Sequence, residues 1–144
     1  MGKRNETTVV VVHCSATRPD SKVTFDDIRR WHMMERAFMD IGYHFVIERD
    51  GSLKQGRAID DWGAHVKGHN HESVGICLVG GMDARGQAED NFTPLQKRML
   101  RFLVAGCRGL WPGVTVKGHH HYNRDKECPS FDVQAWLLDE GMAP

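Results

Sequence analysis

Near the N-terminus stands the β-branched run Thr7-Thr8-Val9-Val10-Val11-Val12-His13-Cys14. An unbroken run of this kind is typical of a strand buried on both faces, as in α/β proteins with helices on each side of the sheet. The run ends at His13, and ligands of open α/β sheets collect at the carboxyl ends of the strands. Strand alternation turns Cys14 to the opposite side, where we expect it to pack in the core.

The composition is that of an ordinary globular chain. Its 144 residues are 40% hydrophobic and 26% charged, with 19 basic and 19 acidic residues and a formal net charge of +0. A nucleic-acid or anionic-membrane partner would require a basic surplus, which is absent. We therefore expect a monomer with one domain spanning residues 1–144 and a core at about residues 7–140.

The N-terminal residues lead directly into the first strand, without the apolar region of a signal peptide. No apolar run approaches the length of a transmembrane helix. The four cysteines show no C-x-x-C spacing, and we expect reduced thiols. These features predict a cytoplasmic chain that does not insert into membranes.

Strand and helix signals alternate along the rest of the chain. Strands are predicted at residues 43–49, 52–55, 73–79 and 114–116, with Asp50-Gly51 as a hairpin turn. A first helix begins at the N-cap Thr24, ends before Asp40 and carries an apolar stripe formed by Phe25, Ile28 and Trp31. Residues 56–72 show no period, which favours a functional loop.

Two more helices are predicted in the second half. Thr93-Pro94-Leu95-Gln96 combines an N-cap, a proline at the first helical position and a capping-box glutamine. The apolar face of this helix is expected to consist of Leu95, Met99, Phe102, Leu103 and Leu110. Ser130 is predicted to cap the last helix, which carries Phe131, Val133, Trp136 and Leu137.

The reactive side chains are concentrated near the C-terminus, in Val116-Lys117-Gly118-His119-His120-His121-Tyr122-Asn123-Arg124-Asp125-Lys126-Glu127-Cys128-Pro129-Ser130-Phe131-Asp132. Neutral imidazole and thiolate are preferred zinc ligands. The alternative is a histidine-rich surface loop with a buried cysteine. A metal site is favoured by the distant His13, because metal enzymes commonly assemble ligands from separate strand ends.

His13, one of His119–His121 and Cys128 are too few ligands for a closed structural zinc site. Three protein ligands plus water is the catalytic pattern, and it indicates a hydrolase. Phosphoester and amide substrates both fit this pattern. The sequence has neither H-E-x-x-H nor H-x-E…P-C-x-x-C, which argues against thermolysin-like proteases and zinc deaminases.

Five strings resemble the zinc-dependent N-acetylmuramoyl-L-alanine amidases, above all the small amidase-type lysozymes (endolysins) of bacteriophages, which are related to peptidoglycan recognition proteins. They are His13-Cys14-Ser15-Ala16-Thr17, Gly42-Tyr43-His44-Phe45, Asn70-His71-Glu72-Ser73-Val74-Gly75-Ile76-Cys77-Leu78-Val79-Gly80-Gly81, Asn91-Phe92-Thr93-Pro94 and Lys126-Glu127-Cys128-Pro129-Ser130-Phe131-Asp132. The resemblance covers nearly the whole chain. It implies a single α/β domain with a mixed central sheet, flanking helices and zinc in a surface groove.

Carried over residue by residue, the resemblance implies His13 and Cys128 as zinc ligands. The second histidine is open to two assignments. The family's pattern of strand, small residue and histidine falls on His119, whereas an ungapped count back from Cys128 falls on His120. We prefer His119, because a strand is more constrained than a loop.

The resemblance also implies roles for residues around the metal. It places the catalytic tyrosine on Tyr43, which the local pattern alone would make an ordinary aromatic strand residue, and the catalytic lysine on Lys126. Tyr43 would orient the attacking water or donate to the oxyanion, and Lys126 would stabilise the negative charge. His65 and Asn70 are expected substrate contacts in the groove.

The implied reaction is hydrolysis of the amide between N-acetylmuramic acid and L-alanine of the stem peptide. The implied partner is bacterial peptidoglycan, reached when a phage endolysin leaves the host cytoplasm for the cell wall. A non-catalytic peptidoglycan recognition module is the alternative, although such modules typically lack the thiolate ligand that Cys128 supplies here. A regulatory role on another protein is compatible with catalysis and leaves no mark in the sequence.

Overall fold

The computed structural model describes residues 2–144. The centre of the fold in these residues is a five-stranded mixed sheet. The strand order is β3-β2-β4-β1-β5. Strand β1 pairs parallel with β4 and β5, β2 pairs parallel with β4, and β2 and β3 form an antiparallel hairpin. The bounds are β1 Val9–Cys14, β2 Phe45–Ile47, β3 Leu53–Gln55, β4 Ser73–Leu78 and β5 Thr115–Gly118. The predicted α/β fold with a mixed central sheet is confirmed.

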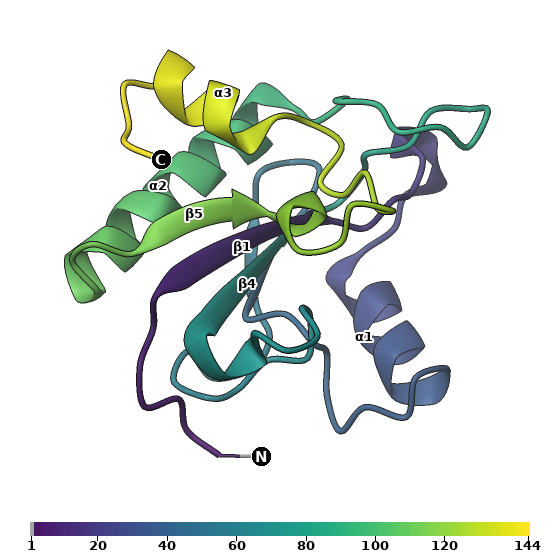
Figure 1. Cartoon of the computed structure of the whole chain (residues 1–144). Helices are drawn as coiled ribbons and strands as arrows, with labels where there is room; N and C mark the ends of the chain where they lie inside the picture. The colour runs from purple at the N-terminus through teal and green to yellow at the C-terminus, as the bar shows by residue number, and fades with distance from the viewer. Residues whose placement is uncertain (1) are drawn as a thin grey trace.

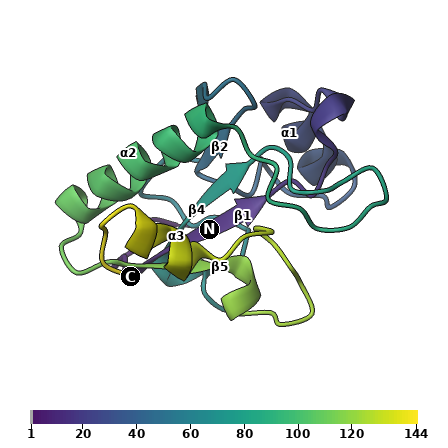
Figure 2. The ribbon, with the colours of Figure 1, turned by 90° about the horizontal axis from the view of Figure 1, so that it is seen from above.

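Three α-helices cover the sheet, and their bounds are α1 Phe25–Met34, α2 Pro94–Leu110 and α3 Val133–Asp139. Helices α2 and α3 lie on one side of the sheet and α1 on the other (Figures 1 and 2). Short 3₁₀ turns occur at η1 Pro19–Ser21, η2 Asn70–Glu72 and η3 His119–His121. No helix in residues 2–144 is both long and apolar enough to cross a membrane.

Strand β1 is buried along its whole length, as the valine run predicts. Val10 and Val12 belong to the core that α2 and α3 cover. Val9 and Val11 pack on the opposite face against Val66 of the long 56–72 loop. Burial of both faces removes apolar surface from water on each side, which stabilises β1 in the middle of the sheet.

The predicted starts of α1 and α2 are confirmed by their hydrogen bonds. Thr24 and Asp27 form a capping box at α1, and Thr93 and Gln96 form another at α2. The buried Gln96 also donates from Nε2 to the carbonyl of Ile47, at 3.1 Å, and to that of Val79, at 2.9 Å. The same side chain therefore completes the helix start and joins α2 to the ends of β2 and β4.

Helix α1 is shorter than predicted, because it ends at Met34 rather than just before Asp40. Ala37 has a φ of 56°, in the left-handed region where an α-helix cannot continue. The predicted stripe is nevertheless on the inner face, since Ile28 is buried and Phe25 and Trp31 pack against its cluster.

The predicted apolar face of α2 is wrong for Leu95, Phe102 and Leu110, which are 54%, 64% and 61% exposed. The buried face consists of Gln96, Leu100, Val104 and Cys107, with Met99 and Leu103 partly buried beside it. The helix carries two apolar stripes, and the one with the smaller side chains faces the sheet. Periodicity alone does not distinguish two such stripes.

The predicted N-cap of the last helix is also wrong. Asp132, not Ser130, caps α3, and its Oδ1 accepts a hydrogen bond from Ala135 N at 3.0 Å. Ser130 has a φ of 71°, and its hydroxyl donates to the carbonyl of Gly81 at 2.8 Å. A tertiary contact thus takes the hydroxyl that would otherwise cap the helix.

The two faces of α2 yield a test of this core. Leu100→Ala removes a fully buried side chain and should lower the free energy of unfolding by about 2–5 kcal/mol. Phe102→Ala removes a larger side chain from the exposed stripe and should change the free energy of unfolding by only about 0.5 kcal/mol. Urea denaturation of both variants measures the difference, and an equal loss in both would contradict the assignment of the buried face.

Candidate metal centre

The register of two neighbouring strands brings two histidines together. Parallel pairing of β1 with β5 places Val12 opposite Gly118. The next residue along the chain is a histidine in both cases, His13 within β1 and His119 just after β5, and the ring centroids of the two lie 4.5 Å apart. The sheet therefore delivers two imidazoles to one point from positions 106 residues apart in sequence, the difference between 119 and 13.

Cys128 joins this pair at the end of the loop that follows η3. The loop is tied down by a hydrogen bond from His120 N to the Cys128 carbonyl at 2.9 Å. The Cys128 sulfur accepts a second bond from Cys14 N at 3.1 Å. The ligand atoms of His13, His119 and Cys128 all lie within 4.8 Å of one another. Two imidazoles and a thiol that leave one position open are the donor set of a catalytic zinc site.

A groove of about 590 Å³ opens over this cluster. All seven residues singled out from the sequence line it, namely His13, Tyr43, His65, Asn70, His119, Lys126 and Cys128. Helix α1 contributes a further wall, which includes Trp31, Glu35 and Arg36. The structure thus brings together every predicted site residue in one concave surface.

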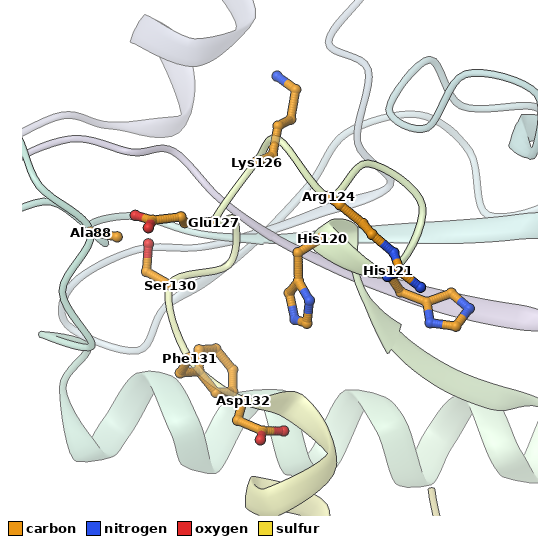
Figure 3. A pocket seen from close by; sticks show the side chains of 9 residues that line it. All are labelled: Ala88, His120, His121, Arg124, Lys126, Glu127, Ser130, Phe131 and Asp132. Atoms are coloured by element: carbon orange, nitrogen blue, oxygen red, sulfur yellow. The ribbon is translucent and has the colours of Figure 1, made fainter.

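The neighbouring His120 faces a different hollow. Its Nε2 lies only 2.6 Å from where a Cβ on Gly118 would stand, so the ring folds back over β5. A second pocket of about 740 Å³ is lined by His120, His121, Arg124, Phe131 and other residues of this segment. In Figure 3 the His120 ring reaches into that pocket, toward Phe131 and Asp132, while Lys126 points away from the other labelled side chains.

The two clustered histidines are held in the neutral form. Burial lowers the pKa of His13 well below its usual value, and the nearby His65 and His119 add to the effect. Burial also lowers the pKa of His119 to about 4, with a further contribution from the Lys126 charge. Neutral imidazoles keep a lone pair free, as metal coordination requires.

The thiol is protonated unless a cation is present. The contact with the Cys14 thiol and burial both raise the pKa of Cys128 well above its usual value, and they outweigh the hydrogen bond from Cys14 N, which lowers it. A bound cation has the opposite effect, because a coordinating thiol loses its proton outright. A cation bound at this point would therefore be coordinated by a thiolate.

Tyr43 packs directly against the cluster, with its ring centroid 5.0 Å from that of His13. Burial raises the pKa of its hydroxyl well above the usual value, so that it remains a hydrogen-bond donor. Lys126 is exposed at the rim, on the loop that carries Cys128. A neutral donor and a cation thus flank the three clustered side chains.

His32 has a structural role that the sequence interpretation missed. It is buried in α1, its Nδ1 accepts a hydrogen bond from Gly42 N at 2.8 Å, and its ring lies 5.3 Å from that of Tyr43. It therefore supports the segment that carries Tyr43. His32 lies four residues after Ile28, on the same face of α1, and this spacing was the feature of the sequence that could have indicated its inward position.

His65 and Asn70 line the groove, and they form hydrogen bonds within the chain. Asn70 Oδ1 accepts from His65 N at 2.9 Å and from Val66 N at 3.0 Å. The His65 ring bonds to His13 on one side, at 2.8 Å, and to Ser73 on the other, at 3.1 Å. These hydrogen bonds hold the irregular 56–72 loop against the group formed by His13, His119 and Cys128.

The chain is similar to known amidases in both sequence and structure. The family model of N-acetylmuramoyl-L-alanine amidases matches residues 3–131. The endolysin of Klebsiella phage KP32 is 48% identical over 134 residues, which cover 93% of this chain and 87% of the relative. The endolysin amidase LysCS of Clostridium intestinale superposes with a TM-score of 0.81 at 25% identity over 95% of this chain and 85% of that one. The recognition protein PGRP-LB of Drosophila superposes with a TM-score of 0.79 at 27% identity, and the match covers 100% of this chain and 86% of that one.

A further buried histidine, His44, lies behind the groove and makes the fold sensitive to acid. Its Nδ1 accepts from Gly75 N at 3.0 Å and its Nε2 lies 2.7 Å from the carbonyl of Asp61. Burial lowers the pKa of His44 to about 4, against about 6.5 in an unfolded chain. The unfolded chain therefore takes up the proton first, and the stabilisation present above about pH 6.5 is lost as the pH falls toward 4.

We expect the free energy of unfolding to fall between pH 7 and pH 5, with about 1–2 kcal/mol of the loss coming from His44. His44→Asn keeps an acceptor near the position of Nδ1 but does not titrate. This variant should be less stable at pH 7 and should lose less between the two pH values. Urea denaturation at both pH values measures the slope, and parallel curves for the two proteins would contradict this role of His44.

Proposed function

The chain belongs to the N-acetylmuramoyl-L-alanine amidase family, and on that basis we propose that His13, His119 and Cys128 hold a catalytic zinc ion. The protein is an amidase of the phage endolysin type. It hydrolyses the bond between N-acetylmuramic acid and L-alanine of the stem peptide. The observation that carries the zinc proposal is the mutual approach of the two imidazoles and the thiol within 4.8 Å.

The donor set supports zinc in particular. Zinc is bound by imidazole nitrogen and thiolate sulfur, and three protein ligands leave a position for water or substrate. When bound, zinc supplies an acidified water and polarises the scissile carbonyl. Hydrolysis adds water to the carbonyl carbon and breaks the carbon–nitrogen bond. A lactyl carboxylate and the free amino group of L-alanine are released.

Tyr43 and Lys126 are the proposed catalytic residues. The hydroxyl of Tyr43 stays protonated because burial raises its pKa, so it can orient the attacking water or donate to the oxyanion as charge develops. Lys126 brings a positive charge from the rim of the groove. Both groups are in place before the reaction, which makes their stabilisation of the developing charge effective.

Peptidoglycan occupies the groove in this proposal. The wall formed by α1, together with His65 and Asn70, would contact the glycan-linked stem peptide on either side of the scissile amide. The protein would act as a monomer, remain in the host cytoplasm after synthesis and reach the cell wall at lysis. The groove is open to the surface, as a polymeric substrate requires.

The metal assignment can be tested by single substitutions. Cys128→Ala, His13→Ala and His119→Ala should each abolish stoichiometric zinc binding, because each removes one of only three ligands. His120→Ala is the matched control, and it should retain one zinc per chain. Elemental analysis after dialysis measures the zinc content per chain of each variant. A variant His120→Ala that loses its zinc, beside a His119→Ala that keeps it, would reverse the assignment of the second histidine.

A second test separates the enzyme from a recognition module. Lys126→Ala and Tyr43→Phe should retain zinc and bind purified cell walls, because neither side chain is a ligand. Their turnover should fall by on the order of 10²–10³, the loss expected when one preorganised stabiliser of transition-state charge is removed. Release of free L-alanine amino termini measures turnover. Full turnover in both variants would exclude these two catalytic roles, and walls bound but never cleaved by the unaltered protein would indicate a recognition module.

A further inference from the structure

A series of hydrogen bonds runs from His13, in the candidate metal site, through His65 to Ser73 in the sheet. His13 Nε2 lies 2.8 Å from His65 Nδ1, and His65 Nε2 lies 3.1 Å from the hydroxyl of Ser73. Ser73 is the first residue of β4 and is fully buried. Both ring nitrogens of His65 are thus engaged within the protein, although the ring lines the groove.

A metal on Nδ1 of His13 would leave the chain of bonds only one direction. A neutral imidazole has one N–H donor and one acceptor nitrogen. Because His13 Nε2 contacts His65, Nδ1 is the nitrogen of His13 left for a metal. Nε2–H of His13 then donates to Nδ1 of His65. The remaining hydrogen of His65 lies on Nε2 and donates to Ser73.

The position of the His65 ring is enforced by two close backbone approaches. A Cβ on Gly75 would lie 2.6 Å from His65 Cγ, and a Cβ on Gly63 would lie 2.6 Å from His65 Cδ2. Only glycine leaves room for the imidazole at these two points. Asn70 holds the main chain on either side of the ring, through its bonds to His65 N and Val66 N.

We propose that His65 is a positioning residue that accepts a hydrogen bond from His13 and thereby fixes its orientation and tautomer for metal binding. The inference rests on the proposed zinc site. It assigns to His65 a second role beside the substrate contact proposed above. Metal-bound histidines characteristically donate their second N–H to a fixed acceptor, and loss of that acceptor weakens metal binding by about 10–100-fold.

Zinc affinity measured by competition with a chromogenic chelator tests this role. His65→Ala should bind zinc about 10–100-fold more weakly than the unaltered protein. His65→Asn offers a carbonyl oxygen near the position of Nδ1 and should recover most of the affinity. His71→Ala is the matched control on the same loop, since His71 is exposed and contacts Glu72 and the ring of Trp62 rather than the metal-site residues. Its affinity should not change.

The tautomer of His13 provides a second readout, which a merely structural loss would not reproduce. In the zinc-loaded protein, nitrogen-15 NMR should place the hydrogen of His13 on Nε2. Thermal unfolding of each variant establishes that it is folded before its affinity is interpreted.

Three results would overturn the inference. The first is His65→Ala binding zinc as tightly as the unaltered protein while losing affinity for soluble muropeptides, which would make His65 a substrate contact. The second is His65→Asn binding zinc as weakly as His65→Ala, which would exclude the acceptor role. The third is an unaltered protein that binds no zinc, and this result alone would also remove the proposed metal site.

Discussion

The parallel pairing of β1 with β5 is the constraint on which the site depends. It sets Val12 opposite Gly118, and His13 and His119 are the next residues along the chain. A slip of β1 by one residue would only exchange valines between its two apolar faces, but it would turn His13 away from the groove and into the core that α2 and α3 cover. The apolar core on that side therefore also keeps His13 beside His119.

Burial has a second consequence at the carboxyl ends of these strands. It keeps His13 and His119 neutral and Tyr43 protonated by shifting the pKa of each group away from its charged form. The exposed Lys126 then brings a positive charge to the rim beside uncharged histidine and tyrosine side chains. Such a site suits a cation in its resting form and an anion during the reaction.

The parts of the fold that depend on neighbouring residues were predictable from the sequence. The valine run and the capping boxes at Thr24 and Thr93 are local signals, and the structure confirms them. The inner face of α2 was not predictable, because two apolar stripes compete on one helix. Ser130 was misassigned because its hydroxyl bonds to Gly81, a residue 49 positions away in sequence.

The candidate site shows the same division. The gathering of His13 and His119 follows from strand ends, and the roles of Tyr43 and Lys126 were expected only through family resemblance. The bond between His13 and His65 spans 52 residues and depends on a loop without periodicity. No pattern in the sequence could have indicated it, because the glycines that seat the ring lie on two separate segments.

The loop between η3 and Cys128 has an evolutionary consequence. Its ends are fixed by main-chain bonds at His120 and by the contact of Cys128 with Cys14, whereas residues 124–127 are exposed. Insertions or deletions can therefore accumulate at residues 124 and 125 while His119, Lys126 and Cys128 keep their places. Alignments of related chains should be anchored on the strand that ends at Gly118, since a count back from the cysteine shifts with every change in loop length.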